Sequence, residues 1–475
     1  MHHLRNPLTR RAVSSRRAVI VAAALALVSA ATALAEDAPK YIFIFLADGG
    51  SAGGMEIARS FNRVVHGEAF TITDKVMRDG SLGLLTTHAA DSLTTDSAAA
   101  ATALAAGCKA NIGAVGVCAD GHTSKTVMER AREKGMRAAL VTTSTVYDAS
   151  PAAFLSHLSN RKDFESILDQ YLRAAPDLIL GGGREQFLPA GRPESARKGG
   201  KDRLAEFTAR GYAYASDKAG LAKASGAKLL GLFTPGEMNF DLDRDVNKEP
   251  SLVEMTRAAI RFLGRDDRGF MAFIENENTD SAGHLTDVAS MVQAYRDFDR
   301  AVALAYEFYV IHRRETLILV TSDHDSGGVG FTLALQDLRP DAKRVAANEE
   351  DLKKIASIPI SLRKAAALLG PRPTAEAVDR MMHDVFKGFR LAPDLKKMLL
   401  AAQPPARNLY TDPVANILGL MVANNTQVYW GSGGHTHQPV FVAALGVGAE
   451  RFRGYQDNTD FAKHLFSLLG TPNSK

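Results

Sequence analysis

Acidic and imidazole side chains recur in this chain directly after runs of apolar residues. One such run, 40–47, ends at Asp48, and another, 316–322, is followed by the pair Asp323-His324. Carboxylates and imidazoles together are common zinc ligands, and open α/β sheets place their sites at the carboxyl ends of strands. One histidine alone is more often structural, but the repeated placement favours a shared metal centre formed by Asp48, Glu275, Asp280, His284, Asp323, His324 and His435.

Ser97 is the candidate nucleophile. It lies in the stretch 94–113, where Asp96-Ser97 precede an Ala-rich run, and Ala is the best helix former. A helix that begins at or just after Ser97 would hold its hydroxyl against unpaired N–H groups, which favour an alkoxide and an anionic substrate. The alternative is an ordinary helix cap, because Asp and Ser are both preferred there.

Arg161 is the candidate phosphate clamp, since a guanidinium can bind two oxygens of one phosphate. Pro151 suits the first turn of a helix capped by Ser150, and we predict that this helix continues to Arg161. By default Arg161 would then be a solvated charge at the helix end.

Continuous apolar runs indicate the strands that would position these side chains. Helices are expected at 252–263 and about 287–310, and residues 190–235 are expected to be mixed, loop-rich structure. The runs expected to form buried strands are 40–47, 136–143, 176–183, 270–275, 316–322 and 440–445.

Residues 331–430 differ from the rest because their pattern is helical and charged. Prolines interrupt them, among them Pro371, Pro373, Pro393, Pro404 and Pro405. We interpret this segment as an insertion between two strands of the main sheet, which covers part of the site or forms an oligomer contact. The remainder of 36–475 is expected to be one catalytic domain.

Residues 1–35 are predicted to be a signal peptide. Five arginines and no acid precede an apolar run that ends at Ala33-Leu34-Ala35, a small-x-small cleavage pattern. Residues 15–20 resemble a twin-arginine signal, and the general secretory route is the alternative. A membrane anchor is disfavoured because the run is short and Ala-rich. The mature protein is therefore expected to be periplasmic or secreted, without a stable membrane span.

Removal of this segment changes the charge balance. The whole chain has 57 basic and 53 acidic residues, and loss of the five arginines leaves 52 basic residues and a net charge of −1. No basic bias remains to indicate nucleic-acid binding. The two cysteines, Cys108 and Cys118, are expected to form a disulfide, because an exported protein meets an oxidising compartment.

Together these motifs resemble the alkaline phosphatase family over nearly all of the mature chain. The most specific are T-D-S-A-A-A-A-T-A at 95–103, the spacing of Glu275, Asp280 and His284, and the strand that ends in Asp323-His324. The resemblance implies an α/β fold with a large, mostly parallel central sheet, helices on both faces and a helical insertion. It also implies hydrolysis of phosphate monoesters through a phosphoserine, two Zn²⁺, one Mg²⁺ and a homodimer.

The roles implied by the resemblance are carried over residue by residue. Ser97 matches the phosphorylated serine and Arg161 the phosphate clamp, while Asp148 matches the residue beside the magnesium in bacterial members. The implied metal ligands are Asp280, His284 and His435 for the first zinc, Asp323, His324 and Asp48 for the second, and Asp48, Ser150 and Glu275 for magnesium.

This chain departs from the family pattern at two positions. Ser281 follows Asp280 where well-known relatives carry Lys or His, and His437 stands two residues after His435 where Gly is common. His437 is therefore the competing ligand for the first zinc. The insertion is also longer than in compact bacterial relatives.

Three other functions are alternative interpretations of this pattern. A phosphodiesterase of the same superfamily often uses Thr as the nucleophile and lacks this three-metal ligand set. A sulfatase needs an Arg four residues after the nucleophile, where this chain has Ala101. A catalytically silent phosphate- or metal-binding protein would not need the complete set of nucleophile, clamp and ligands.

Overall fold

The computed structural model describes residues 38–335, 343–404, 410 and 412–470. The chain divides into two units, 1–38 and 39–475, and the predicted signal peptide lies outside the described residues. None of the described helices is long and apolar enough to cross a membrane.

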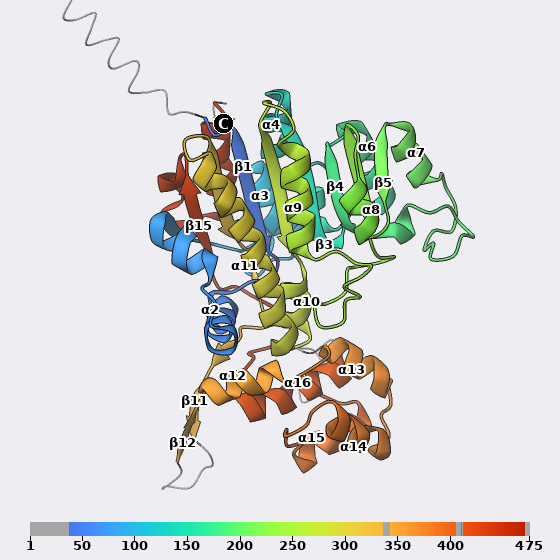
Figure 1. Cartoon of the computed structure of the whole chain (residues 1–475), viewed down its shortest axis with the longest axis vertical. Helices are drawn as coiled ribbons and strands as arrows, with labels where there is room; N and C mark the ends of the chain where they lie inside the picture. Colours follow the sequence, from blue (N-terminus) through green and yellow to red (C-terminus); the bar gives the residue numbers. More distant parts are fainter. Residues whose placement is uncertain (1–37, 336–342, 405–409, 411, 471–475) are drawn as a thin grey trace, which may run out of the picture. The chain divides into compact units, whose positions relative to one another are not determined.

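The second unit is built on a ten-stranded sheet (Figure 1). Its strands run parallel except β15, which pairs antiparallel with both of its neighbours. In spatial order they are β16 (Gly454–Gln456), β2 (Ser81–Leu85), β15 (Val440–Gly446), β8 (Thr316–Thr321), β1 (Tyr41–Ala47), β7 (Phe270–Asn276), β3 (Arg137–Thr145), β4 (Leu178–Gly182), β6 (Lys228–Leu232) and β5 (Tyr212–Ala215).

The central strand β1 is buried on both faces because helices cover both sides of the sheet. Phe43 and Phe45 belong to one hydrophobic cluster, whereas Ile42 and Ile44 belong to the other, as the two-residue period of a strand requires. This arrangement explains why the strand sequence is a continuous apolar run without polar alternation. The predicted α/β fold class is confirmed.

Helices of the two faces contribute to different clusters. The first face carries α2 (Ala52–Phe61), α8 (Lys218–Lys223), α9 (Leu252–Leu263) and α11 (Val288–Ile311). The second carries α3 (Ser97–Ala106), α4 (Val127–Glu133), α5 (Ala149–Ala153), α6 (Phe164–Ala174), α7 (Arg203–Ala209) and α17 (Asn458–Leu468). Between β7 and α11 lies one short helix, α10 (Asn278–His284).

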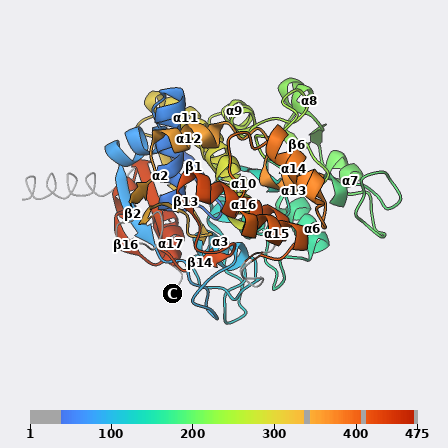
Figure 2. The same ribbon diagram turned by 90° about the horizontal axis from the view of Figure 1, so that it is seen from below.

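The segment between β8 and β15 is mainly helical, as its pattern predicts. Its helices lie beyond the carboxyl ends of the central strands, in front of α10 when seen from below (Figures 1 and 2). They are α12 (Glu349–Ala356), α13 (Leu362–Leu369), α14 (Ala375–Asp384), α15 (Pro393–Ala401) and α16 (Pro413–Thr426). Three short antiparallel pairs flank them: β9 (Asp325–Ser326) with β14 (His435–Thr436), β10 (Gly330–Phe331) with β13 (Val428–Tyr429), and β11 (Leu333–Leu335) with β12 (Arg344–Ala346).

Two expectations from the sequence were wrong. The helix predicted to run from Pro151 to Arg161 ends at Ala153, because Leu158 leaves it to form a bridge with Val115. Ser150 lies inside this helix and does not cap it, since the cap position belongs to Asp148. The stretch 190–235, predicted to be mixed structure, contains β5 and β6, which extend the sheet at one edge.

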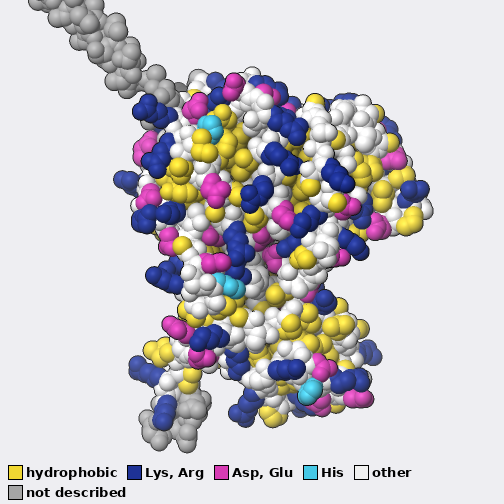
Figure 3. Space-filling model, viewed as in Figure 1, with side chains coloured by type: hydrophobic (Ala, Val, Ile, Leu, Met, Phe, Trp, Pro, Cys, Tyr) yellow, Lys and Arg dark blue, Asp and Glu magenta, His cyan; other side chains and the backbone are white. Residues whose placement is uncertain are grey.

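On the face drawn in Figure 3, basic and acidic side chains are interspersed over the described residues.

Candidate active site

Ser97 occupies the first position of α3, and Asp96 caps the helix by accepting a hydrogen bond from the amide of Ala99. The cap and the candidate nucleophile are therefore two different residues. The Ser97 side chain is almost fully buried, and its Oγ lies 3.3 Å from Nε2 of His324. A hydroxyl at this position faces the unpaired amides and the positive end of the helix dipole.

Three buried side chains gather beside Ser97, and we call them cluster A: Asp48, Asp323 and His324. Nε2 of His324 lies 3.1 Å from Oδ2 of Asp323 and 3.6 Å from Oδ1 of Asp48. Asp48 follows β1 and the other two follow the adjacent β8, so the parallel strands deliver all three to one edge. The turn after Asp48 requires glycine, because Gly49 has φ +63° and a Cβ there would lie 2.7 Å from Cα of Asp280.

A second group, cluster B, consists of Asp280, His284 and His435. One turn of α10 separates the first two, and Nε2 of His284 lies 3.2 Å from Oδ2 of Asp280. His435 arrives from β14, whose pairing with β9 places it opposite Ser326, close to His324 in the chain. Nε2 of His435 lies 3.1 Å from Nε2 of His284, whereas His437 is exposed and outside the cluster.

The two imidazole rings of cluster B are oriented by hydrogen bonds at Nδ1. Nδ1 of His284 bonds the Gly433 carbonyl at 2.6 Å, and Nδ1 of His435 bonds the Thr95 carbonyl at 2.8 Å. A carbonyl can only accept, so each Nδ1 carries the proton and each Nε2 is left free to bind a cation. The two rings are thus prepared as Nε2 ligands.

Charge crowding perturbs the ionisation of these groups. Burial raises the pKa of Asp48 well above its usual value, and nearby Asp323 adds to the rise. Burial alone would lower the pKa of His284, but Asp280 raises it to about 9. Burial and the neighbouring His324 lower the pKa of His435 to about 4. Bound cations would relieve this crowding, because a positive charge favours ionised carboxylates and neutral imidazoles.

Two buried carboxylate oxygens support metal binding. Oδ1 of Asp48 and Oδ2 of Asp323 accept no hydrogen bond, although buried polar atoms nearly always have a partner. Both oxygens belong to cluster A. Carboxylate oxygens with imidazole nitrogens form a donor set that suits zinc, so the residues present fit the metal that the sequence predicts.

A third group of oxygen atoms adjoins cluster A and belongs to the residues that the sequence predicts as magnesium ligands. Ser150 Oγ donates to Oδ2 of Asp48 at 3.1 Å, and Glu275, at the end of β7, accepts from Thr142 Oγ1. Burial raises the pKa of Glu275 to about 8. An all-oxygen set of this kind suits a hard cation such as Mg²⁺.

Arg161 lies between two carboxylates. Its Nη1 donates to Oδ2 of Asp96 at 3.2 Å, and its Nη2 donates to Oδ1 of Asp148 at 3.0 Å. Burial alone would lower the pKa of Arg161, but Asp148 and Asp96 raise it above its ordinary value. Arg161 is on a turn held by a backbone hydrogen bond from its amide to the Gly113 carbonyl, and the Gly113 amide donates in turn to Asp96.

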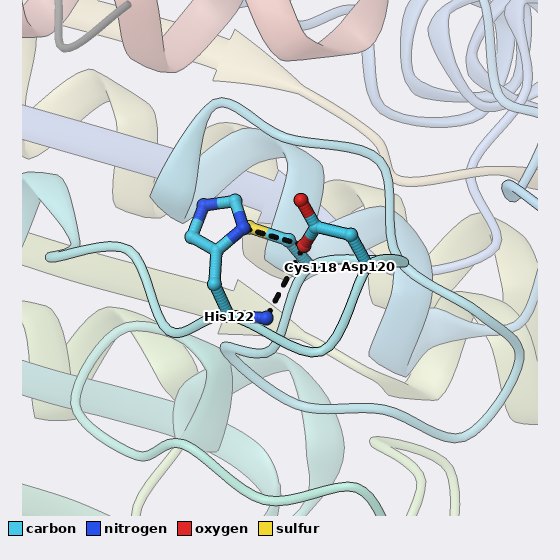
Figure 4. Close-up of side chains that lie close together, drawn as sticks. All are labelled: Cys118, Asp120 and His122. Carbon is cyan, nitrogen blue, oxygen red and sulfur yellow. Dashed lines mark hydrogen bonds and ion pairs between the residues drawn. The ribbon is translucent and has the colours of Figure 1, made fainter.

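Gly113 belongs to the loop closed by the predicted disulfide, which is present between Cys108 and Cys118. The loop thus supports both Asp96 and Arg161. Asp120 and His122 form an ion pair near Cys118 (Figure 4). This group is not a metal site, because metal binding requires a thiolate and the Cys118 sulfur is already bonded.

A cavity of about 390 Å³ opens between these groups. Ser97, Arg161, Asp48, Asp148, Asp280 and His284 line it, as expected for residues that share one site. Sequence reasoning missed three other charged residues that line it: Glu237, Glu277 and Arg363. For Glu277 a signal existed, since it follows Glu275 by two residues at a strand end. Nothing in the sequence pointed to Arg363, which comes from α13 of the insertion.

Comparison with known proteins identifies alkaline phosphatases as relatives. The family model described as alkaline phosphatase matches residues 39–471. The chain is 32% identical over 389 residues to alkaline phosphatase 3 of Bacillus subtilis strain 168, a match that covers 79% of this chain and 77% of that protein.

Solved structures of alkaline phosphatases also match this chain. The alkaline phosphatase of Thermus thermophilus matches with a TM-score of 0.82 and 27% identity, covering 92% of this chain and 93% of that one. The cold-active alkaline phosphatase of a Shewanella species matches with a TM-score of 0.74 and 26% identity, covering 90% and 99% of the two chains.

Proposed function

Because the chain belongs to the alkaline phosphatase family, and is thus an enzyme that hydrolyses phosphate monoesters, we propose that it does so through a phosphoserine at Ser97. One observation carries this proposal. Ser97 Oγ is buried at the start of α3, 3.3 Å from Nε2 of His324 in cluster A, and lines the same cavity as Arg161. A nucleophile, a cationic clamp and a metal-binding cluster therefore meet at one place.

Arg161 would bind two non-bridging oxygens of the phosphoryl group. Each Nη nitrogen carries two hydrogens, and each uses one of them on a carboxylate, Asp96 or Asp148. The second hydrogen of each is left for the substrate. The two carboxylates fix the plane of the guanidinium before the substrate binds, which lowers the entropic cost of orienting it.

We propose that clusters A and B each hold one zinc ion and that Asp48, Ser150 and Glu275 hold magnesium. When bound, these cations neutralise the phosphoryl charge, lower the pKa of the Ser97 hydroxyl and stabilise the leaving oxygen. Ser150 Oγ lies 3.1 Å from Oδ2 of Asp48, so Asp48 would serve both cluster A and the magnesium set. The family is metal-dependent. What we propose is the identity of each ion, zinc in clusters A and B and magnesium in the third set.

His435 is the proposed histidine of cluster B. Its Nε2 lies 3.7 Å from Oδ1 of Asp280, and its Nδ1 is held by a backbone carbonyl. His437 is exposed. Replacing His435 by alanine should reduce bound zinc from two ions to one, measured by mass spectrometry of metals, whereas His437→Ala should leave both. The reverse pattern would overturn the assignment.

The substrate class is tested by comparing an aryl phosphate monoester with the corresponding diester. The mature protein is stripped with a chelator and then resupplied with zinc and magnesium. We expect fast monoester turnover that returns only with the metals, and little diester turnover. Preference for the diester would overturn the substrate class, and no turnover with zinc bound would favour a silent binding protein.

We propose in addition that residues 1–35 direct export and are removed, and that the mature protein is a periplasmic or secreted homodimer. The disulfide Cys108–Cys118 supports the first point, because disulfides persist in oxidising compartments. N-terminal sequencing of protein from the periplasm or medium tests the cleavage, and light scattering of the purified protein tests the dimer. An intact N-terminus, or the mass of a monomer, would contradict the respective point.

A further inference from the structure

We infer that Arg363 of the insertion binds the alcohol part of the substrate, so that the enzyme favours phosphate monoesters whose alcohol carries a second anionic group. The class includes carboxylate-bearing monoesters and bisphosphates. This inference deepens the proposed function and rests on it.

The start of α13 is anchored to the main body on both sides of its first turn. Ser361, which caps the helix, donates from its amide to Oδ1 of Asp243 at 3.2 Å and from its hydroxyl to Oδ2. The amide of Leu362 donates to Oδ2 of Asp287 at 2.7 Å, and Asp287 also caps α11. Arg363 comes next in the chain. The hydrogen bonds to Asp243 and Asp287 therefore fix the backbone from which the Arg363 side chain reaches the cavity.

The guanidinium of Arg363 is held by three different groups. Its Nη2 donates to Oγ of Ser281 at 2.9 Å, and its Cζ lies 4.7 Å from the ring centroid of Phe240. Its Nη1 lies 3.4 Å from Oε2 of Glu237. The side chain is nonetheless 43% exposed, so a rigid, accessible fork remains at the cavity. Such a fork suits the two oxygens of a carboxylate or phosphate.

Ser281 holds Arg363 at the cavity by accepting a hydrogen bond from it. Its hydroxyl donates to Oε1 of Glu277 at 3.0 Å while it accepts from Arg363. Both functions of the hydroxyl are therefore used, and the small side chain leaves the cavity open. Among the described residues that line the cavity, Arg161 and Arg363 are the two arginines, and there is no lysine.

The proposed mechanism assigns the two arginines to different parts of the substrate. Arg161 is bonded to Asp96, which directly precedes the nucleophile. Ser97 lies beside cluster A, and in an in-line displacement the leaving oxygen departs on the side opposite the attacking oxygen. Cluster B is therefore the cluster that we assign to the leaving oxygen. Ser281 directly follows Asp280 of this cluster on α10. Arg363 is consequently placed beside the leaving alcohol and not beside the transferred phosphoryl group.

Glu237 competes with an anionic substrate for Arg363. Its side chain is 44% exposed, and exposed ion pairs are weak, so a bound carboxylate can displace it. Removing the charge of Glu237 should therefore strengthen the preference for an anionic alcohol, whereas removing Arg363 should abolish it. These opposite signs separate a substrate contact from a purely structural role.

The test measures kcat/KM for 3-carboxyphenyl phosphate and for phenyl phosphate with the metal-loaded enzyme, and takes the ratio of the two values. We expect Arg363→Ala to lower this ratio about tenfold, as for the loss of one charge-assisted contact, and Arg363→Lys to lower it less. Glu237→Gln should raise it. The matched control is Arg372→Ala, which removes an exposed arginine from the same insertion and should leave the ratio unchanged.

An equal loss for both substrates in Arg363→Ala, with the ratio unchanged, would overturn the inference. If that variant is unstable, Arg363→Lys and Glu237→Gln still decide, and a ratio that fails to move in opposite directions in these two would overturn it. Failure of the wild-type enzyme to hydrolyse either ester would instead overturn the proposed function, and this inference with it.

Discussion

Replacing Arg161 by alanine should weaken phosphate binding without unfolding the site. Its two carboxylate partners keep other hydrogen bonds: Asp96 still accepts from the amides of Ala99 and Gly113, and Asp148 still accepts from Ser144 Oγ at 3.1 Å. Neither acid is therefore left without a partner, and the metal clusters contain no atom of Arg161.

The magnitude follows from the two hydrogens that the guanidinium leaves for the substrate. A hydrogen bond to a charged group contributes about 1.5–3 kcal/mol, and about 1.4 kcal/mol corresponds to a tenfold change in affinity. Loss of the paired contact should therefore raise the inhibition constant of inorganic phosphate at least tenfold, and Arg161→Lys should fall between alanine and wild type because it keeps the charge but loses the fork.

The assay is competitive inhibition of aryl phosphate hydrolysis by inorganic phosphate, with zinc content measured on the same samples. An unchanged inhibition constant at full zinc content would refute the clamp. Loss of zinc together with affinity would show instead that Arg161 supports the metal clusters.

Three further outcomes are expected. The double variant Cys108→Ser, Cys118→Ser should lose about 3 kcal/mol of unfolding free energy, as expected when a disulfide that closes a short loop is removed. The measurement is urea denaturation, and an unfolding free energy equal to that of the wild type would contradict this. Ser326→Ala removes the hydroxyl that donates to the carboxylate of cluster B and should weaken zinc binding about 10–100-fold, measured by competition with a chelator; equal zinc retention would contradict it. The hydrogen bond with Glu129 raises the pKa of His157, and despite opposing burial it lowers the pKa of Glu129. The free energy of unfolding that His157→Gln removes should therefore be largest between the ordinary values of 4.5 and 6.5. It should shrink as pH falls through the lowered pKa of Glu129 or rises through the raised pKa of His157; a difference independent of pH would contradict the pairing.

Residues at the ends of central strands were predictable because the strands that deliver them are buried on both faces. The run 40–47 is continuously apolar, and its end therefore locates Asp48 at the carboxyl edge without further information. The same holds for Asp323 and His324 after β8. The helix at Ser97 was also predictable, since alanine favours a helix even where, as here, every residue of it is buried.

The prediction was wrong where tertiary contacts override local preference. The helix after Ser150 ends early because Leu158 pairs with Val115 across the chain, and no local pattern reports such a partner. Arg363 was missed for the same reason. Its place at the cavity depends on two carboxylates of the main body, Asp243 and Asp287, which accept hydrogen bonds from the start of α13. Both partners are distant in sequence, so a local sequence pattern could not predict these contacts.

In the proposed reaction, Ser97 carries the phosphoryl group during turnover. The most direct measurement is acid quenching of the metal-loaded enzyme during hydrolysis of an aryl phosphate, followed by mass spectrometry of its peptides. We expect a phosphate on the peptide that contains Ser97, and neither this label nor turnover in Ser97→Ala. A phosphate on another residue, or turnover by Ser97→Ala at the wild-type rate, would contradict it.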